Sequence, residues 1–252
     1  RELDIWIPEK KLAIEICGSY WHNDHHLSKT YHQEKLFMCN ERGIKLLTLF
    51  DFDLKKKHII EGLIRNNLGI ESARIPARKC QIMPITPTQA KSFNNDHHIR
   101  GHAPASHHYG MFHNDLLVAV GSWSRSRYEK TNPCLELIRL SSSNPVHGLL
   151  GKMTHHASRE LGERKIVSYV DLRYGNGKSY IAAGYQHIKT TSPGYWYVDA
   201  NLQCWHRSTF MKKNLKKYSN YQPDKTEFEI MDELQYNRIW DCGHKLFQWE
   251  AN

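Results

Sequence analysis

RELDIWIPEKKLAIEICGSYWHNDHH, residues 1–26, is the stretch that decides the fold of the first part of the chain. Apolar and polar residues alternate in it on both sides of Pro8-Glu9-Lys10-Lys11. Alternation with a period of two is typical of a strand with one buried face. The stretch therefore predicts a β-hairpin whose turn is centred between Glu9 and Lys10. Its register pairs Ile7 with Leu12, Ile5 with Ile14 and Asp4 with Glu15.

The predicted hairpin brings the carboxylates of Asp4 and Glu15 together. Like charges directly opposite each other destabilise a sheet, so a cation between them is expected. Carboxylate oxygens suit Mg²⁺, with Mn²⁺ as the alternative, and such an ion activates water for phosphoryl displacement. His22 is then the candidate general base, assisted by Asp24 or Lys35. The alternative is a surface hairpin whose two acidic residues have no function.

The residues after the hairpin predict a helix, a buried strand and a second helix. The first helix covers residues 29–42 and ends before a glycine. The apolar run 44–50 has the length of a buried strand. Asp51 or Asp53 then caps a helix that ends at Leu68. Basic side chains on these helices either bind DNA phosphates or form an ordinary solvated face: Lys29, His32, Lys55 and Lys56.

Two strings in this region carry a family resemblance. LDIWIPEKKLAIEICGSYWHNDHH and YHQEKLFMCNERGIKLLTLFDFD resemble the very-short-patch mismatch-repair endonucleases and the related phage homing endonucleases, which are PD-(D/E)xK-like nucleases. The resemblance covers roughly the first 70 residues. It implies that Asp4 and Glu15 bind the metal and that His22 is the general base. Cys17 occupies the place of the superfamily lysine, which favours His22 in that role.

Composition favours a nucleic-acid partner. The 252 residues carry a formal net charge of +9, and a basic surface binds polyanions through counterion release. The six cysteines include no CxxC pair, which argues against a zinc ribbon or a disulfide framework. No apolar run approaches the roughly 20 residues of a membrane span, and no secretory signal opens the chain. We therefore expect a cytoplasmic protein, and the resemblance to phage enzymes implies a phage-infected bacterial host.

The second part of the chain predicts another domain. Prolines and basic residues in residues 72–87 indicate a linker. Residues 88–200 predict a hairpin around His113-Asn114-Asp115, followed by alternating strands and helices. This order resembles the N-acetyltransferase (GNAT) fold, in which a glycine loop at a helix N-terminus holds the CoA pyrophosphate. The corresponding loop here, PVHGLL, lacks the leading polar residue and places Leu150 against the phosphate. We therefore expect no acyl-CoA and a fold reused for DNA recognition.

Residues 201–252 form a basic extension with interleaved aromatic residues. Cations and rings in this pattern bind phosphates and stack on bases, although an exposed helix kept soluble by its lysines has the same composition. Residues 236–249 predict a terminal hairpin with Asp241-Cys242-Gly243-His244 as its turn. The candidate DNA-binding residues of this extension are Arg207, Lys212, Lys213, Lys216 and Lys217.

These features combine into one prediction of an α/β (α+β) protein. A PD-(D/E)xK-like nuclease domain would cover residues 1–71, a linker 72–87, a GNAT-like domain 88–200, and the basic tail and hairpin 201–252. The predicted function is metal-dependent cleavage of a specific site in double-stranded DNA, by a homodimer or by successive nicks. The alternatives are a mismatch nickase, a DNA-binding protein without catalysis, and an acyl-CoA-dependent transferase acting on nucleic acid or protein.

Overall fold

The computed structural model describes residues 2–70, 74–126, 134–218 and 220–251, which form a mixed α/β fold. The chain makes two compact units, and both are built from segments that are distant in the sequence. The first unit comprises Arg1–Lys57, Asp171–Tyr174 and Thr191–His244. The second comprises His58–Val170, Gly175–Thr190 and Lys245–Asn252.

The predicted N-terminal hairpin is confirmed. Strand β1 (Ile5–Ile7) runs antiparallel to β2 (Leu12–Cys17), with Ile5 opposite Ile14 and Ile7 opposite Leu12. The turn is a short 3₁₀ helix, η1 (Pro8–Lys10). Strand β3 (Lys45–Phe50) continues the sheet parallel to β2, as the buried apolar run predicted.

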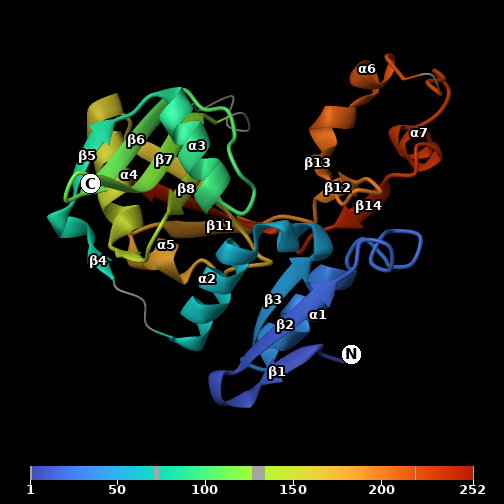
Figure 1. Cartoon of the computed structure of the whole chain (residues 1–252), viewed down its shortest axis with the longest axis horizontal. Coiled ribbons are helices and arrows are strands. Elements are labelled where there is room, and N and C mark those ends of the chain that lie inside the picture. Colours follow the sequence, from blue (N-terminus) through green and yellow to red (C-terminus); the bar gives the residue numbers. More distant parts are fainter. Residues whose placement is uncertain (1, 71–73, 127–133, 219, 252) are drawn as a thin grey trace. The chain divides into compact units, whose positions relative to one another are not determined.

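One helix packs on this sheet. Helix α1 (Tyr31–Glu41) lies against β2 and β3 (Figure 1). It buries Leu36 and Cys39 against Ala13 and Leu46 of the strands. The expected second helix is divided in the structure. A 3₁₀ helix, η2 (Asp51–Lys56), comes first and is followed by α2 (Lys57–Leu68).

The C-terminal part of the first unit adds a separate three-stranded sheet in the order β13-β12-β14. Its core combines Tyr197, Phe210, Leu215, Ile230 and Met231, all buried. The elements are β12 (Tyr195–Val198), β13 (Cys204–His206), η4 (Arg207–Phe210), α6 (Lys212–Leu215), α7 (Glu227–Glu233) and β14 (Asn237–Trp240).

A seven-stranded sheet forms the second unit, in the order β11-β15-β10-β8-β7-β6-β5. The hairpin predicted around Asn114 and Asp115 is confirmed, because β6 and β7 pair antiparallel. The strands are β5 (Gln81–Pro84), β6 (His107–His113), β7 (Leu116–Arg125), β8 (Leu135–Ser142), β10 (Lys165–Asp171), β11 (Gln186–Thr190) and β15 (His244–Glu250).

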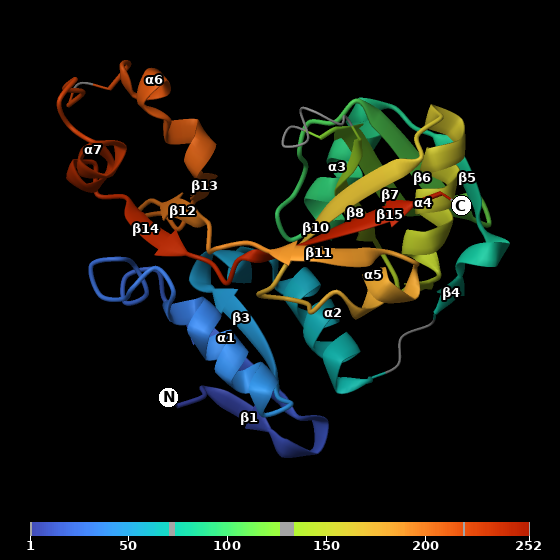
Figure 2. The ribbon, with the colours of Figure 1, turned by 180° about the vertical axis from the view of Figure 1, so that it is seen from behind.

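Helices cover both faces of this sheet. Helix α3 (Pro87–His97) packs Ala90 and Phe93 against Val120, whereas α4 (Leu149–Leu161) packs Met153 and Ala157 into a separate core cluster. Figures 1 and 2 show α3 and α4 on opposite faces. A short helix, α5 (Lys178–Ala182), precedes β11.

The predicted terminal hairpin is wrong. Strand β14 pairs with β12 in one sheet, whereas β15 lies between β10 and β11 in the other. Gly243, with φ 79°, and the Asp241 carboxylate, which accepts hydrogen bonds from Gly194 N and Gly243 N, direct the chain from one sheet to the other. The terminal segment therefore belongs to both units.

The expected linker also differs from the structure. Residues 72 and 73 lie outside the described part of the chain, but the rest of this segment is regular. It forms β4 (Ile75–Pro76), η3 (Ala77–Lys79) and β5, the edge strand of the large sheet. Proline is tolerated there because an edge strand leaves N–H positions unpaired. In the part of the chain that the structure describes, no helix is long and apolar enough to cross a membrane.

Candidate functional site

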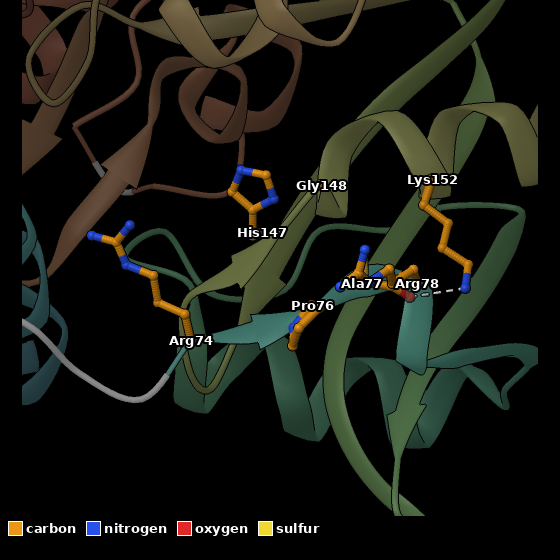
Figure 3. Close-up of a pocket in the computed structure, with 7 residues that line it drawn as sticks. All are labelled: Arg74, Pro76, Ala77, Arg78, His147, Gly148 and Lys152. Carbon is orange, nitrogen blue, oxygen red and sulfur yellow. Dashed lines mark hydrogen bonds between the residues drawn. The ribbon is translucent and has the colours of Figure 1, made fainter.

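A pocket of about 620 Å³ lies in the second unit, beside the first turn of α4 (Figure 3). Two arginines, a lysine and a histidine contribute to its wall. Among the described residues that line it, none is acidic. The lining residues are Arg74, Pro76, Ala77, Arg78, His147, Gly148 and Lys152.

A short parallel pair of strands builds this wall. Strand β4 pairs with β9 (Val146–His147), with Ile75 opposite Val146 and Pro76 opposite His147. Ile75 N also donates to Pro145 O over 2.9 Å. Because β4 and β9 lie side by side, the residues that flank β4 reach the loop that leads into α4. Residues some 70 positions apart thereby line one pocket.

Lys152 fixes the other side of the pocket. Its Nζ donates to Ala77 O over 2.9 Å and to Cys80 O over 2.5 Å, which ties the first turns of α4 to η3. Figure 3 shows the Lys152 side chain reaching the backbone of Ala77. The positive charge of Lys152 therefore remains at the pocket while its position is held by two carbonyl groups.

The N-terminus of α4 points its own donors toward this region. Gly148 precedes the 13-residue helix in the left-handed conformation, with φ 81°, and offers no side-chain cap. The first N–H groups of a helix have no intrahelical acceptor, and the helix dipole makes that end positive. Backbone donors and cationic side chains thus line the same pocket. Such an arrangement suits a phosphate or another polyvalent anion.

The steric objection from Leu150 is wrong. Leu150 is only 8% exposed and belongs to the core cluster that includes Met153, Ala157 and Tyr185. Its side chain packs into the protein beneath the helix, because the second residue of α4 faces the sheet. The first turn of α4 therefore leaves room for an anion.

Strands β8 and β10 are parallel neighbours in the large sheet. The register of β8 and β10 pairs Leu135 through Leu137 with Ile166 through Ser168. Ser168 Oγ donates to Leu137 O over 3.2 Å and lies 3.1 Å from the Tyr180 hydroxyl, where this pairing ends. Burial raises the pKa of Tyr180, so the hydroxyl carries its proton at neutral pH. Ligands of α/β folds commonly bind beyond the carboxyl ends of parallel strands.

The predicted catalytic acids lie in the first unit. Asp4 Oδ2 accepts a hydrogen bond from Ile16 N over 2.7 Å, and Asp4 is exposed. Glu15 is buried and paired with the equally buried Lys35, Oε1 to Nζ 2.5 Å. Burial raises the pKa of Glu15, while the Lys35 ammonium acts in the opposite direction. The structure therefore brings Asp4, Glu15 and Lys35 to one end of the hairpin, but Glu15 already has a cationic partner.

His22 and Asp24 have different neighbours. His22 Nδ1 lies 3.0 Å from His32 Nε2. Burial lowers the pKa of His22 below its ordinary value. Asp24 is ion-paired with Arg238 of β14, so it is engaged away from the two acids. Lys35 and Asp4 are among the charges that act on His22, so four of the five predicted catalytic residues are neighbours, and Asp24 is the exception.

The predicted DNA-binding residues are mostly exposed, with one clear exception. His32 is 3% exposed and its Nδ1 donates to Trp240 O, so it offers no surface to DNA. Lys55 Nζ donates to Asn201 O over 2.6 Å. Arg207 lies over the ring of Tyr195 and Lys217 over that of Tyr218. The remaining exposed lysines are Lys29, Lys212, Lys213 and Lys216. DNA binding by this surface stays a prediction.

The chain is similar to known proteins at the level of solved structures. No protein-family model matches the chain, and no curated protein does. A GNAT family acetyltransferase from Elizabethkingia anophelis with acetyl-CoA bound is similar at 11% identity and a TM-score of 0.36, covering 69% of this chain and 99% of that one. The ribosomal-protein-S18-alanine N-acetyltransferase of Escherichia coli is similar at 9% identity and a TM-score of 0.37, covering 68% of this chain and 93% of that one. Arabidopsis thaliana Naa50 is similar at 10% identity and a TM-score of 0.38, covering 69% of this chain and 99% of that one.

These comparisons contradict the endonuclease identification. The matched structures named above are acetyltransferases, and none is a homing or very-short-patch endonuclease. The expected PD-(D/E)xK nuclease, its hydrolase activity and its Mg²⁺ or Mn²⁺ cofactor are therefore wrong, as is the expectation that acyl-CoA plays no part.

Sequence reasoning missed the pocket as a site. Arg74 and Arg78 stood out as basic residues of a linker, and His147 belonged to a loop judged unable to bind phosphate. The missing information was the β4–β9 pairing, which joins the two segments. A two-residue strand has no periodic pattern, so no sequence signal could have indicated it.

Proposed function

We propose that the chain is an acyl-CoA-dependent acyltransferase whose second unit holds the phosphate groups of CoA in the pocket at the N-terminus of α4. The observation that carries this proposal is that Arg74, Arg78 and Lys152 line one pocket beside the first turn of a 13-residue helix that has no side-chain cap. CoA carries a pyrophosphate and a ribose phosphate, and such groups are bound by helix N-termini and by arginine.

The reaction would be transfer of an acyl group from the CoA thioester to an amine. The amine nitrogen attacks the thioester carbonyl, the carbon–sulfur bond breaks, and the products are an amide and the CoA thiol. The leaving thiolate takes up one proton and the attacking nitrogen releases one, which restores the proton of the group that protonates the sulfur. We assign this role to Tyr180, because its buried hydroxyl stays protonated and lies where the pairing of β8 and β10 ends.

The acceptor would be an acidic macromolecule. The net charge of +9 favours a polyanion, and the exposed cations of η4 and α6 offer a surface for it in the first unit. Nucleic acid carries exocyclic amines together with a dense negative charge. We therefore propose nucleic acid as the acceptor, with acidic protein as the alternative outcome of the test.

The test is transfer of a radiolabelled acetyl group from acetyl-CoA. Intact chain is incubated with labelled acetyl-CoA and with double-stranded DNA, single-stranded RNA or an acidic protein, and the label on each polymer is counted after separation. The proposal predicts label on a nucleic acid, with release of one CoA thiol per group transferred. Binding of CoA without transfer to any polymer would contradict the proposed acceptor. Absence of both binding and transfer would contradict the proposed acyltransferase.

A further inference from the structure

Three potential metal ligands meet in the first unit, far from the pocket in the sequence. Cys17 ends β2, His22 lies in the turn that follows, and His32 lies in the first turn of α1. Cys17 Sγ and one ring nitrogen from each histidine all lie within 4.8 Å of one another. The turn brings His22 back over the strand end, with His22 N donating to Gly18 O over 3.0 Å.

His32 is oriented as a metal ligand by its second nitrogen. Nδ1 lies 2.8 Å from Trp240 O, and a carbonyl oxygen can only accept, so Nδ1 carries the proton. The lone pair of neutral His32 is then on Nε2, which faces His22 Nδ1 at 3.0 Å. A backbone carbonyl behind a histidine is the usual second partner of a metal-bound imidazole, since it fixes the tautomer and the ring orientation.

The spacing of the two imidazoles also fits a shared ion. Two nitrogens bound to zinc at about 2.0–2.1 Å in tetrahedral geometry lie roughly 3.3 Å apart. The observed 3.0 Å between His22 Nδ1 and His32 Nε2 is close to this separation. The rings are nearly parallel, with an interplanar angle of 20°. His22 is half-exposed, so its ring can turn to admit the ion.

Cys17 supplies the soft ligand of the cluster. It is fully buried and packs with Phe50, Phe52, Val198 and Ile239. This apolar wall fixes the sulfur and excludes water behind it. His22 is the one accessible member of the cluster, so an ion and a fourth ligand such as water would enter from its side.

We propose that Cys17, His22 and His32 form a binding site for one zinc-class transition-metal ion. One sulfur and two imidazole nitrogens select zinc, cobalt or a similar ion over Mg²⁺ and Ca²⁺, which prefer oxygen ligands. Three protein ligands leave one position open, as in zinc sites that bind water or substrate. The site is independent of CoA binding and belongs to the other unit.

A cobalt titration of the intact chain tests this site. Metal is first removed with a chelator, and Co²⁺ is added while the absorption spectrum is recorded. The site predicts one equivalent of Co²⁺ with a thiolate-to-cobalt charge-transfer band and intense visible bands typical of a tetrahedral ion. A spectrum without the charge-transfer band would overturn the proposal, because the alternative is a simple hydrogen bond between the two histidines.

Matched variants separate this cluster from the other thiols and histidines. Cys17→Ser should abolish the charge-transfer band, and His32→Gln should weaken cobalt binding at least tenfold. Cys39→Ser, another buried cysteine, and His26→Gln, an exposed histidine of the same turn, should leave the spectrum unchanged. An equal loss in Cys39→Ser would overturn the assignment.

A second measurement covers the case in which a ligand variant does not fold. X-ray absorption of the intact chain loaded with one equivalent of zinc reports the ligand atoms directly. One sulfur and two imidazoles in the ligand shell support the site, whereas a shell of nitrogen and oxygen alone contradicts it.

Discussion

Arg173 Nη1 lies 2.9 Å from Asp53 Oδ2, although the two residues are 120 positions apart in the sequence. Both side chains are buried, and Arg173 also donates to Asp171 and lies 5.0 Å from the ring centroid of Phe50. This ion pair joins the short segment Asp171–Tyr174 to η2, which follows β3, within the first unit. It explains why a segment that follows β10 belongs to that unit.

Removing this arginine should strongly destabilise the first unit. We expect Arg173→Met to lower the free energy of unfolding by about 3–5 kcal/mol, because two carboxylates would lose their buried cation. Urea unfolding followed by tryptophan fluorescence measures the change. The control is Arg65→Ala, whose partner Glu61 is exposed, and it should change stability by less than about 1 kcal/mol. Equal effects of the two variants would contradict this role of Arg173.

Substitution of glycine by alanine should have opposite effects on stability at two positions. A Cβ at Gly121 of β7 would lie 2.1 Å from the buried ring of Trp123, so Gly121→Ala should destabilise by about 1–3 kcal/mol or more. Gly62 lies inside α2 with nothing within 4 Å of its Cβ position. Gly62→Ala should stabilise by about 0.5–1 kcal/mol, because alanine has the higher helix propensity. Thermal unfolding of both variants checks the two signs.

A substitution in the turn between β6 and β7 should make the protein more stable. Asn114 and Asp115 have φ values of 49° and 62°, which is the conformation of a two-residue type I′ turn. Glycine adopts a positive φ without strain, so Asp115→Gly should raise stability by a few tenths of a kcal/mol, to about 1 kcal/mol. Asp115→Val should lower it, since a β-branched residue resists this conformation. A shift of both melting temperatures in the same direction would contradict the assigned turn.

The proposed proton donor has its own test. Tyr180→Phe keeps the ring, which stacks on Phe247 at 5.1 Å, and removes the hydroxyl. We expect kcat for acetyl transfer to fall about 10²-fold, the lower range for general acid catalysis, while CoA affinity stays unchanged. Ser168→Ala, which removes the hydroxyl's neighbour, should have a smaller effect. Unchanged kcat in Tyr180→Phe would remove this residue from the mechanism.

Local sequence patterns predict where helices and strands lie better than they predict which strands pair with each other. The register of β1 and β2 follows from alternation over a short hairpin, and the β6–β7 turn follows from Asn114 and Asp115. The segment after Trp240 was misjudged because β15 pairs with β11 and β10, strands separated from it by long stretches of sequence. Hydrophobic periodicity shows which face of a strand is buried but not which strand covers its edge.

The same limit applies to the sites. Cys17, His22 and His32 each drew attention from the sequence, but their convergence depends on how α1 packs against the end of β2. Arg74 and His147 meet through a pairing of two residues each. Glu15 lies next to Lys35, so one of the two acids that suggested a divalent ion already has a cationic partner from α1.

Calorimetric titration of CoA into the intact chain tests the central claim most directly. We predict saturable binding of one CoA, with Arg74→Ala and Arg78→Ala each weakening it about tenfold, the loss expected for one charge-assisted contact of roughly 1.4 kcal/mol. Arg159→Ala is the matched control, because Arg159 is an exposed cation in the last turn of the same helix, and it should bind CoA as the intact chain does. Absence of saturable binding, or equal weakening by Arg159→Ala, would contradict a CoA site at the N-terminus of α4.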